Sequence, residues 1–283
     1  MNQSLLVCHN GRFIPCEDAA IASNDGGLLF GDSLFETLKA HRNKIQLKAQ
    51  HLDRLEDAAR RLDFPCPRPQ LETALAQTAA CLTAPVSRLR LTLTRGNHQG
   101  LLWPDSGDGN FLLTAAPYQE PDLFRQDGGA VCVSAPNQRV NPFSPLPQMK
   151  HGNYADCLYA YNRARQAGAD EALFFDDRGT VLEGATSNIF ALIEDRLVTP
   201  PAGTLVLDGI IRQEVIHAAA KSRLLVVEQE LSRKELLGAS EVFLTNSLIE
   251  LLPVTSIDGQ ELQRGQCWAT LLETLRIRQQ FSL

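Results

Sequence analysis

Apolar side chains recur at two different periods along this chain, and each period predicts a different kind of element. Over residues 51–62 the leucines and alanines share one stripe of a helix, with acidic and arginine side chains opposite. Residues 88–95 instead alternate strictly between polar and apolar, which is typical of a strand with one buried face. The chain therefore combines amphipathic helices with half-buried strands.

The same patterns predict the remaining elements. Further helices are expected over residues 69–82, 154–166, 208–222 and 265–280, with a short capped helix after Ser232. Further strands are expected over residues 5–8, 12–15, 34–39, 45–47, 111–115, 130–133, 171–175, 180–184, 187–193 and 241–245. The first two strands flank Asn10-Gly11, which is a hairpin signal. Grouped strands with interspersed helices favour an α+β fold over a doubly wound sheet.

A polar stretch over residues 117–129 divides these elements into two groups. It holds two prolines and lies between strand signals, so we interpret it as an interdomain linker. This gives a smaller N-terminal α+β domain over residues 1–116 and a larger C-terminal α+β domain over residues 130–283.

Composition excludes several classes of function. A hydrophobic fraction of 44% and a charged fraction of 21% are typical of a soluble globular protein, and the net charge of -6 gives no sign of a nucleic-acid surface. No apolar run approaches the ~20 residues that cross a membrane, and the polar start of the chain lacks a secretion signal. Seven scattered cysteines without a CxxC pair predict neither disulfides nor a metal site. We therefore expect a cytoplasmic protein with reduced thiols.

Four features suggest one chemistry. Lys150 precedes a Gly-Asn-Tyr turn and can supply an amine for a Schiff base, and Glu183 ends a strand before a glycine. Residues 209–212 begin a helix, whose free N–H groups and dipole favour a phosphate, and residues 245–247 add polar groups where a strand ends. An amine, a carboxylate and a phosphate cup are what pyridoxal phosphate requires. Each feature taken alone also fits an ordinary surface residue or helix start.

Five stretches, in order and spacing, resemble the class-IV aminotransferase family, the fold-type-IV pyridoxal-phosphate enzymes. They are residues 29–37 (LFGDSLFET), 51–55 (HLDRL), 150–154 (KHGNY), 182–190 (LEGATSNIF) and 209–212 (GIIR). The family includes branched-chain aminotransferases, D-amino-acid aminotransferases and 4-amino-4-deoxychorismate lyases. The resemblance implies a two-domain, D-amino-acid aminotransferase-like α+β fold, pyridoxal 5'-phosphate as cofactor, and a small-molecule amino substrate. It also implies a homodimer in which a partner loop reaches the active site, with the Phe30 and His98 regions as candidates.

Site residues are carried over from the family by position. Lys150 resembles the Schiff-base lysine, Glu183 resembles the partner of the pyridine nitrogen, and Tyr154 resembles the residue at the ring O3′. The positions that resemble the family's phosphate-binding groups are Arg54, Ile210, Ile211 and Ser247. Lys150 would then act as a general base, because burial and the cationic ring lower the pKa of a lysine from ~10.4.

The substrate-side residues divide between two activities. Thr37 resembles the lyase threonine that relays a proton, and Phe30, Lys39, Arg90 and His98 are further candidate substrate contacts. The loop after Arg95 lacks the lyases' Arg-Gly-Tyr, and the Arg-x-His of the D-amino-acid enzymes is also absent. We favour 4-amino-4-deoxychorismate lyase, which forms 4-aminobenzoate and pyruvate in folate biosynthesis. The alternatives are an aminotransferase acting on a branched-chain or D-amino acid, and a non-catalytic partner protein.

Overall fold

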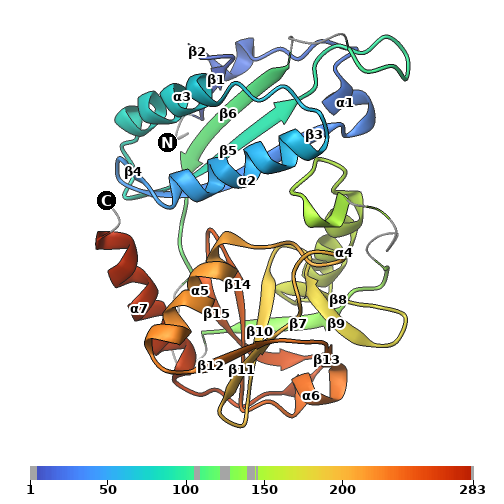
Figure 1. The fold of residues 1–283 in the computed structure, drawn as a ribbon, viewed down its shortest axis with the longest axis vertical. Helices are drawn as coiled ribbons and strands as arrows, with labels where there is room; N and C mark the ends of the chain where they lie inside the picture. Colours follow the sequence, from blue (N-terminus) through green and yellow to red (C-terminus); the bar gives the residue numbers. More distant parts are fainter. Residues whose placement is uncertain (1–4, 105–108, 122–127, 139–143, 145, 282–283) are drawn as a thin grey trace. The chain divides into compact units, whose positions relative to one another are not determined.

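A computed structural model describes residues 5–104, 109–121, 128–138, 144 and 146–281 (Figure 1). The chain divides into two compact units: Met1–Glu120 with Met149–Tyr154, and Pro121–Gln148 with Ala155–Leu283. Residues 122–127 of the predicted linker lie outside the described residues. Each unit combines one sheet with helices, so the predicted α+β class is confirmed. No helix among the described residues is long and apolar enough to span a membrane.

The first unit is built on an antiparallel sheet with the strand order β2-β1-β6-β5-β3-β4 (Figure 1). Its strands are β1 (Leu6–His9), β2 (Arg12–Ile14), β3 (Ser33–His41), β4 (Lys44–Ile45), β5 (Val86–Thr94) and β6 (Asn110–Pro117). Its helices are α1 (Gly26–Phe30), α2 (Lys48–Arg61), α3 (Arg68–Cys81) and the 3-10 turn η1 (Cys16–Asp18). The predicted hairpin joins β1 to β2, and Asn10 and Gly11 take the positive φ values, 49° and 82°, that such a turn requires.

Alternation along β3 and β5 gives this sheet two different faces. Leu34, Leu38, Leu89 and Leu91 are buried in the core formed with α2 and α3, which cover one face of the sheet (Figure 1). The intervening residues of both strands project from the opposite face and carry the polar candidates Thr37 and Arg90. The hydrophobic pattern of the sequence therefore fixes which side chains of this sheet are available for chemistry.

The second unit holds a mixed sheet with the order β12-β11-β10-β14-β15-β7-β8-β9-β13, and β16 pairs with β15. Its strands are β7 (Ala130–Ser134), β8 (Glu171–Phe175), β9 (Thr180–Gly184), β10 (Asn188–Ile193), β11 (Arg196–Thr199), β12 (Leu225–Glu228), β13 (Leu231–Ser232), β14 (Glu241–Asn246), β15 (Glu250–Ile257) and β16 (Gln260–Glu261). Its helices are η2 (Leu146–Gln148), α4 (Ala155–Gln166), α5 (Ile210–Lys221), α6 (Arg233–Leu237) and α7 (Cys267–Phe281). Helix α5 packs against α7 and β14 (Figure 1).

The predicted helices and strands are found in the structure with small shifts at their ends, and the capping box at Ser232 is confirmed. Helix α1, the 3-10 turns η1 and η2, and the strands β11, β12, β13, β15 and β16 were not predicted. Residues 149–154 were expected within the C-terminal domain, but in the structure they belong to the first unit. They do so because their backbone pairs with β3, through Phe35 N–H to Lys150 O at 2.8 Å and Gly152 N–H to Ser33 O at 2.6 Å.

Candidate active site

The Lys150 segment is held against the start of β3 by backbone pairing. Leu34 and His151 form an antiparallel bridge between the two hydrogen bonds described above. A Cβ at Gly152 would overlap Ser33 Oγ, so only glycine allows the two segments to approach this closely. The Lys-His-Gly-Asn-Tyr motif therefore fixes the backbone of Lys150 on a rigid strand.

Around the ring of Phe35 the structure brings together three of the candidate residues. Lys150 Nζ lies 4.6 Å from the ring centroid, and the guanidinium carbon of Arg90 lies 3.8 Å from it. Tyr154 packs edge-on against the same ring, with 5.5 Å between centroids. Phe35 is buried, and Thr37 follows it on the same face of β3, directly across from Arg90 on β5. Lys150, Tyr154, Thr37 and Arg90 thus form one cluster in the first unit.

Arg54 is oriented by a buried carboxylate. Its Nε and Nη2 donate to the two oxygens of Glu36 at 2.8 and 2.6 Å, a bidentate pair that fixes the plane of the guanidinium. His51 Nδ1 donates to the same carboxylate at 2.7 Å. Burial opposes ionisation of Glu36, but the charge of Arg54 and the hydrogen bonds from His51 and Arg54 outweigh it and lower its pKa to about 2. For His51, burial is the main cause of a lowered pKa, so its ring is neutral at pH 7.

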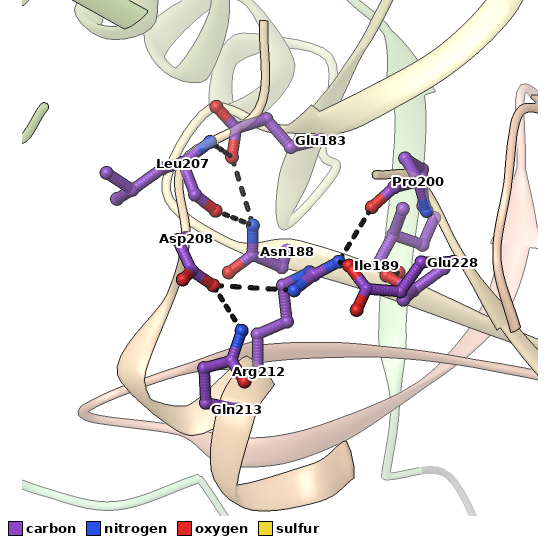
Figure 2. Close-up of polar contacts among 10 residues, drawn as sticks. Glu183, Asn188, Ile189, Pro200, Leu207, Asp208, Arg212, Gln213 and Glu228 are labelled. Carbon is purple, nitrogen blue, oxygen red and sulfur yellow. Dashed lines mark hydrogen bonds and ion pairs between the residues drawn. The ribbon is translucent and has the colours of Figure 1, made fainter. Parts of the chain in front are cut away.

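Glu183 is a buried carboxylate at the end of β9 whose orientation is set by two donors. Its Oε2 accepts from Asn188 Nδ2 and from the backbone N–H of Leu207, both at 3.1 Å (Figure 2). The same Asn188 amide donates to Leu207 O at 2.9 Å, which ties β10 to the loop before α5. Figure 2 shows the second carboxylate oxygen of Glu183 pointing away from these donors. The side chain is therefore held in one direction.

Helix α5 begins beside Asn188. Gly209 is its N-cap and provides no side-chain cap, and a Cβ on Gly209 would overlap Asn188 Oδ1. The first backbone N–H groups of the helix, from Ile210 and Ile211, point out of its start because an α-helix leaves them without intrahelical acceptors. Arg212 anchors this turn: its fully buried side chain donates to Pro200 O at 3.0 Å and pairs with Glu228 (Figure 2).

The strand end next to this helix contributes hydroxyl groups. Ser247 follows β14, and the Asn246 side chain shapes the turn by accepting from Leu248 N–H and Ile249 N–H, both at 2.9 Å. Thr245, which pairs with Asn188 across the sheet, has a buried Oγ1 without a hydrogen-bond partner among the described residues. A buried hydroxyl without a hydrogen bond is energetically costly. A polar group bound beside the start of α5 would give the Thr245 hydroxyl the hydrogen bond that it lacks.

The remaining candidates lie in different surroundings. Phe30 packs against His98 with ring centroids 5.4 Å apart, and His98 Nε2 lies 3.3 Å from Asp32. Lys39 is buried and pairs with Glu120, so its charge is engaged within the first unit. Within the described residues, no group of three or more His, Cys, Asp or Glu side chains is arranged to hold a metal ion.

Each of the two units holds candidate residues whose chemistry fits pyridoxal phosphate. The first unit holds the amine of Lys150, the hydroxyl of Tyr154 and the fixed guanidinium of Arg54. The second unit holds the oriented carboxylate and a helix start next to an orphaned hydroxyl. Sequence reasoning missed two orienting residues, Glu36 and Asn188. Both residues lie inside recognised sequence motifs, but the sequence does not show which side chains they contact.

Comparisons with known proteins show the family to which this chain belongs. A family model described as amino-transferase class IV matches residues 33–257. A protein of Methanocaldococcus jannaschii, provisionally named a branched-chain-amino-acid aminotransferase, is 34% identical over 261 residues, covering 91% of this chain and 89% of its own. The branched-chain aminotransferase of Thermoproteus uzoniensis, solved with norvaline, superposes with a TM-score of 0.88 at 26% identity, covering 96% and 94% of the two chains.

The 4-amino-4-deoxychorismate lyase of Pseudomonas aeruginosa superposes with a TM-score of 0.84 at 28% identity, covering 96% of this chain and 98% of the other. A further branched-chain aminotransferase that the chain resembles was solved with pyridoxamine 5'-phosphate. These superpositions confirm the predicted fold type IV. Together with the family match, they establish the general class of the protein. It is an enzyme of the class IV aminotransferase family, whose cofactor is pyridoxal phosphate.

Proposed function

We propose that the protein is an aminotransferase that moves an amino group between an amino acid and a 2-oxo acid. The observation that carries this proposal is the alignment, over nearly the whole of both chains, with a relative named for that activity. The loop after Arg95 also supports it, because Gln99-Gly100-Leu101-Leu102 stands where lyases of the family carry Arg-Gly-Tyr.

The candidate cofactor-binding residues each receive a role in this proposal. When bound, the cofactor supplies an electron sink for a carbanion at the substrate Cα. Lys150 would hold the cofactor through its amine, and as a free amine it would move the proton at the substrate Cα. Glu183, whose carboxylate accepts from Asn188 and Leu207, would keep a proton on the pyridine nitrogen. Tyr154 would contact the ring O3′, and the phosphate would be held by Arg54, Ile210, Ile211 and Ser247.

Replacement of the lysine tests the proposal directly. Lys150→Ala should lose the visible absorbance of covalently held pyridoxal phosphate and all turnover of amino acids with 2-oxoglutarate. Lys48→Ala, an exposed lysine at the start of α2, is the matched control and should keep both. A Lys150→Ala protein with normal glutamate formation would refute the assignment.

A second candidate function, 4-amino-4-deoxychorismate lyase, is favoured by Thr37. Its hydroxyl shares the face of β3 that carries Phe35, and it lies across from Arg90. In that position it can relay a proton during elimination of pyruvate, and a lyase is among the solved structures that the chain resembles. Aminodeoxychorismate would then yield 4-aminobenzoate and pyruvate. Thr37→Val should abolish that reaction while leaving transamination measurable, and glutamate formation without 4-aminobenzoate would exclude the lyase.

We also propose that the protein is a cytoplasmic homodimer. Six large apolar side chains, from α1 and from the loop after β5, are exposed: Leu28, Leu29, Phe30, Leu101, Leu102 and Trp103. The two segments adjoin each other, since Asp25 bridges Asn97 and Phe30 packs on His98. Such a patch favours burial against a second copy. Analytical ultracentrifugation should give the mass of a dimer for the wild type. The double variant Leu29→Asp, Leu101→Asp should sediment as a monomer. All seven cysteines are free thiols, as a reducing compartment would keep them.

A further inference from the structure

Glu171, the first residue of β8, is a buried carboxylate outside the set of candidate cofactor-binding residues. Its Oε2 accepts from Thr186 N–H at 3.1 Å, from Thr186 Oγ1 at 2.6 Å and from Ser187 Oγ at 2.9 Å. Its Oε1 accepts from Ala172 N–H at 3.0 Å. One carboxylate oxygen thus gathers three donors from a single turn, residues 185–187.

The charge of Glu171 is balanced by dipoles rather than by a cation. Among the described residues, no lysine, arginine or histidine lies within ion-pair distance of it. Burial is the main influence on its pKa, which is raised although the hydrogen bonds from Thr186, Ser187 and Ala172 oppose the shift. Since the folded-state pKa is the higher one, the fold favours the protonated carboxyl, and ionisation of Glu171 weakens it. Stability alone therefore does not account for a carboxylate in this position.

The turn that Glu171 holds connects two strands that are not neighbours in the sheet. It joins β9 to β10, and β14, β15, β7 and β8 lie between these strands in the sheet order. No ladder of backbone hydrogen bonds among the described residues therefore fixes the end of β9 against the start of β10. The turn is closed by Gly184 N–H, which donates to Ser187 O at 2.7 Å. A Cβ on Gly184 would overlap Ser187 Oγ and crowd the Glu171 side chain, so the close approach requires glycine.

The turn lies between two residues that set the direction of the candidate site in this unit. Glu183 precedes Gly184 at the end of β9, and Asn188 is the first residue of β10. The hydrogen bond from Asn188 Nδ2 to Glu183 Oε2 therefore bridges the two strand ends (Figure 2). Asn246 Nδ2 also donates to Thr186 O at 3.2 Å, which links the turn to the end of β14. A shift of residues 185–187 would change the direction of the Glu183 carboxylate.

We propose that Glu171 is a positioning residue: it holds the turn of residues 185–187 so that the Glu183 carboxylate can pair with the pyridine nitrogen of the cofactor. The inference rests on the role proposed for Glu183, but not on which amino acid reacts. Without the acceptor oxygens of Glu171, two hydroxyls and a buried N–H of the turn lose their partners, and the turn rearranges to satisfy them. The Glu183 carboxylate then leaves its direction, and a hydrogen bond weakens steeply with misalignment.

The test uses the full-length protein loaded with pyridoxal phosphate that is ¹⁵N-labelled in its ring. NMR of this nitrogen reports whether it carries a proton, and the signal is followed across the neutral and alkaline pH range. Absorbance titration gives the affinity for pyridoxal phosphate, and thermal unfolding of the cofactor-free protein shows that each variant folds. The variants are Glu171→Gln, Glu183→Gln, both changes together, and Thr186→Val, which removes one donor and keeps the side-chain shape.

Glu241→Gln is the matched control. Glu241 is another buried carboxylate of the same sheet, and burial also raises its pKa. It accepts from Cys267 N–H and Trp268 N–H at the start of α7, at the opposite end of β14 from Asn246. A residue with a purely structural role should therefore behave like Glu241.

The ring nitrogen of the wild type should stay protonated over most of the range. Glu171→Gln should lower the pH at which this proton is lost and weaken pyridoxal phosphate binding about tenfold. Thr186→Val should act in the same direction by a smaller amount, and Glu241→Gln should change neither readout. When Glu183 is already glutamine, Glu171→Gln should have no further effect on the nitrogen signal, because it acts through Glu183.

Three results would overturn the inference: an unchanged nitrogen signal in both Glu171→Gln and Thr186→Val, equal changes in Glu171→Gln and Glu241→Gln, or the same change with and without Glu183. If Glu183→Gln alone leaves the ring nitrogen protonated, the role of Glu183 fails and the inference fails with it. If the nitrogen signals behave as expected but no amino acid reacts, only the proposed aminotransferase reaction fails.

Discussion

Replacing Glu36 by glutamine should weaken both the first unit and its hold on the cofactor. Glu36 is fully buried against Arg54 and His51, and its pKa falls from 4.5 to about 2 on folding. That change corresponds to about 3 kcal/mol in favour of the ionised carboxylate in the folded state at pH 7. Glu36→Gln keeps the size of the side chain but leaves the Arg54 guanidinium, only 17% exposed, without its counter-charge.

The expected loss of unfolding free energy is therefore about 3 kcal/mol at pH 7, measured by urea unfolding of the cofactor-free protein. Because the folded-state pKa is the lower one, the contribution of Glu36 is complete above pH 4.5 and disappears as the pH falls through about 2. The difference between wild type and variant should thus shrink to about 1 kcal/mol at pH 3. Pyridoxal phosphate should also bind more weakly, since Arg54 loses the partner that orients it.

Two further variants make this test specific. Glu56→Gln removes a carboxylate from an exposed pair between α2 and Arg68 and should change stability by less than about 0.5 kcal/mol. Glu36→Gln should cost much less in an Arg54→Met background, because no guanidinium is then left unpaired. The reasoning would be refuted by a Glu36→Gln protein as stable as the wild type, or by an equal loss with and without Arg54.

Two other predictions follow from close contacts in the site. Gly152→Ala should displace the Lys150 backbone, since the new Cβ would overlap Ser33 Oγ, and turnover should fall at least about tenfold. Adding Ser33→Gly to this variant should restore part of the lost turnover. A Gly152→Ala enzyme with normal turnover would contradict the structure. Asn188→Asp should weaken pyridoxal phosphate binding more than Asn188→Ala, because it puts a second carboxylate beside Glu183. Absorbance titration measures both affinities, and the opposite order would show that Asn188 does not orient Glu183.

Periodic patterns were enough to predict most helices of this protein, but not all of its strands. Residues 51–62 and 88–95 each bury one face, so their hydrophobic period matches α2 and β5. Strand β15 was missed because it contains Pro253, which pairs with Phe243 in the interior of the sheet, where proline is rarely found. Short strands such as β11 carry too few residues to show a period.

A candidate site could be proposed from the sequence as far as local motifs carry chemistry. Lys150 and Glu183 were recognised from the residues that flank them. Glu36 was not assigned a role because its partners are 15 and 18 residues away, on the facing side of α2.

Because the Lys150 segment pairs with β3, the first sheet stays incomplete while the chain is being synthesised. Residues 1–120 leave the ribosome before the segment that covers the edge of β3 at Ser33 and Phe35 has been synthesised. During that interval the nascent sheet presents backbone groups that have no partner, a known hazard for association with other strands. A fragment cut after residue 120 would keep this defect permanently. Lys150, the lysine proposed to hold the cofactor, thus lies in the segment that completes the first sheet.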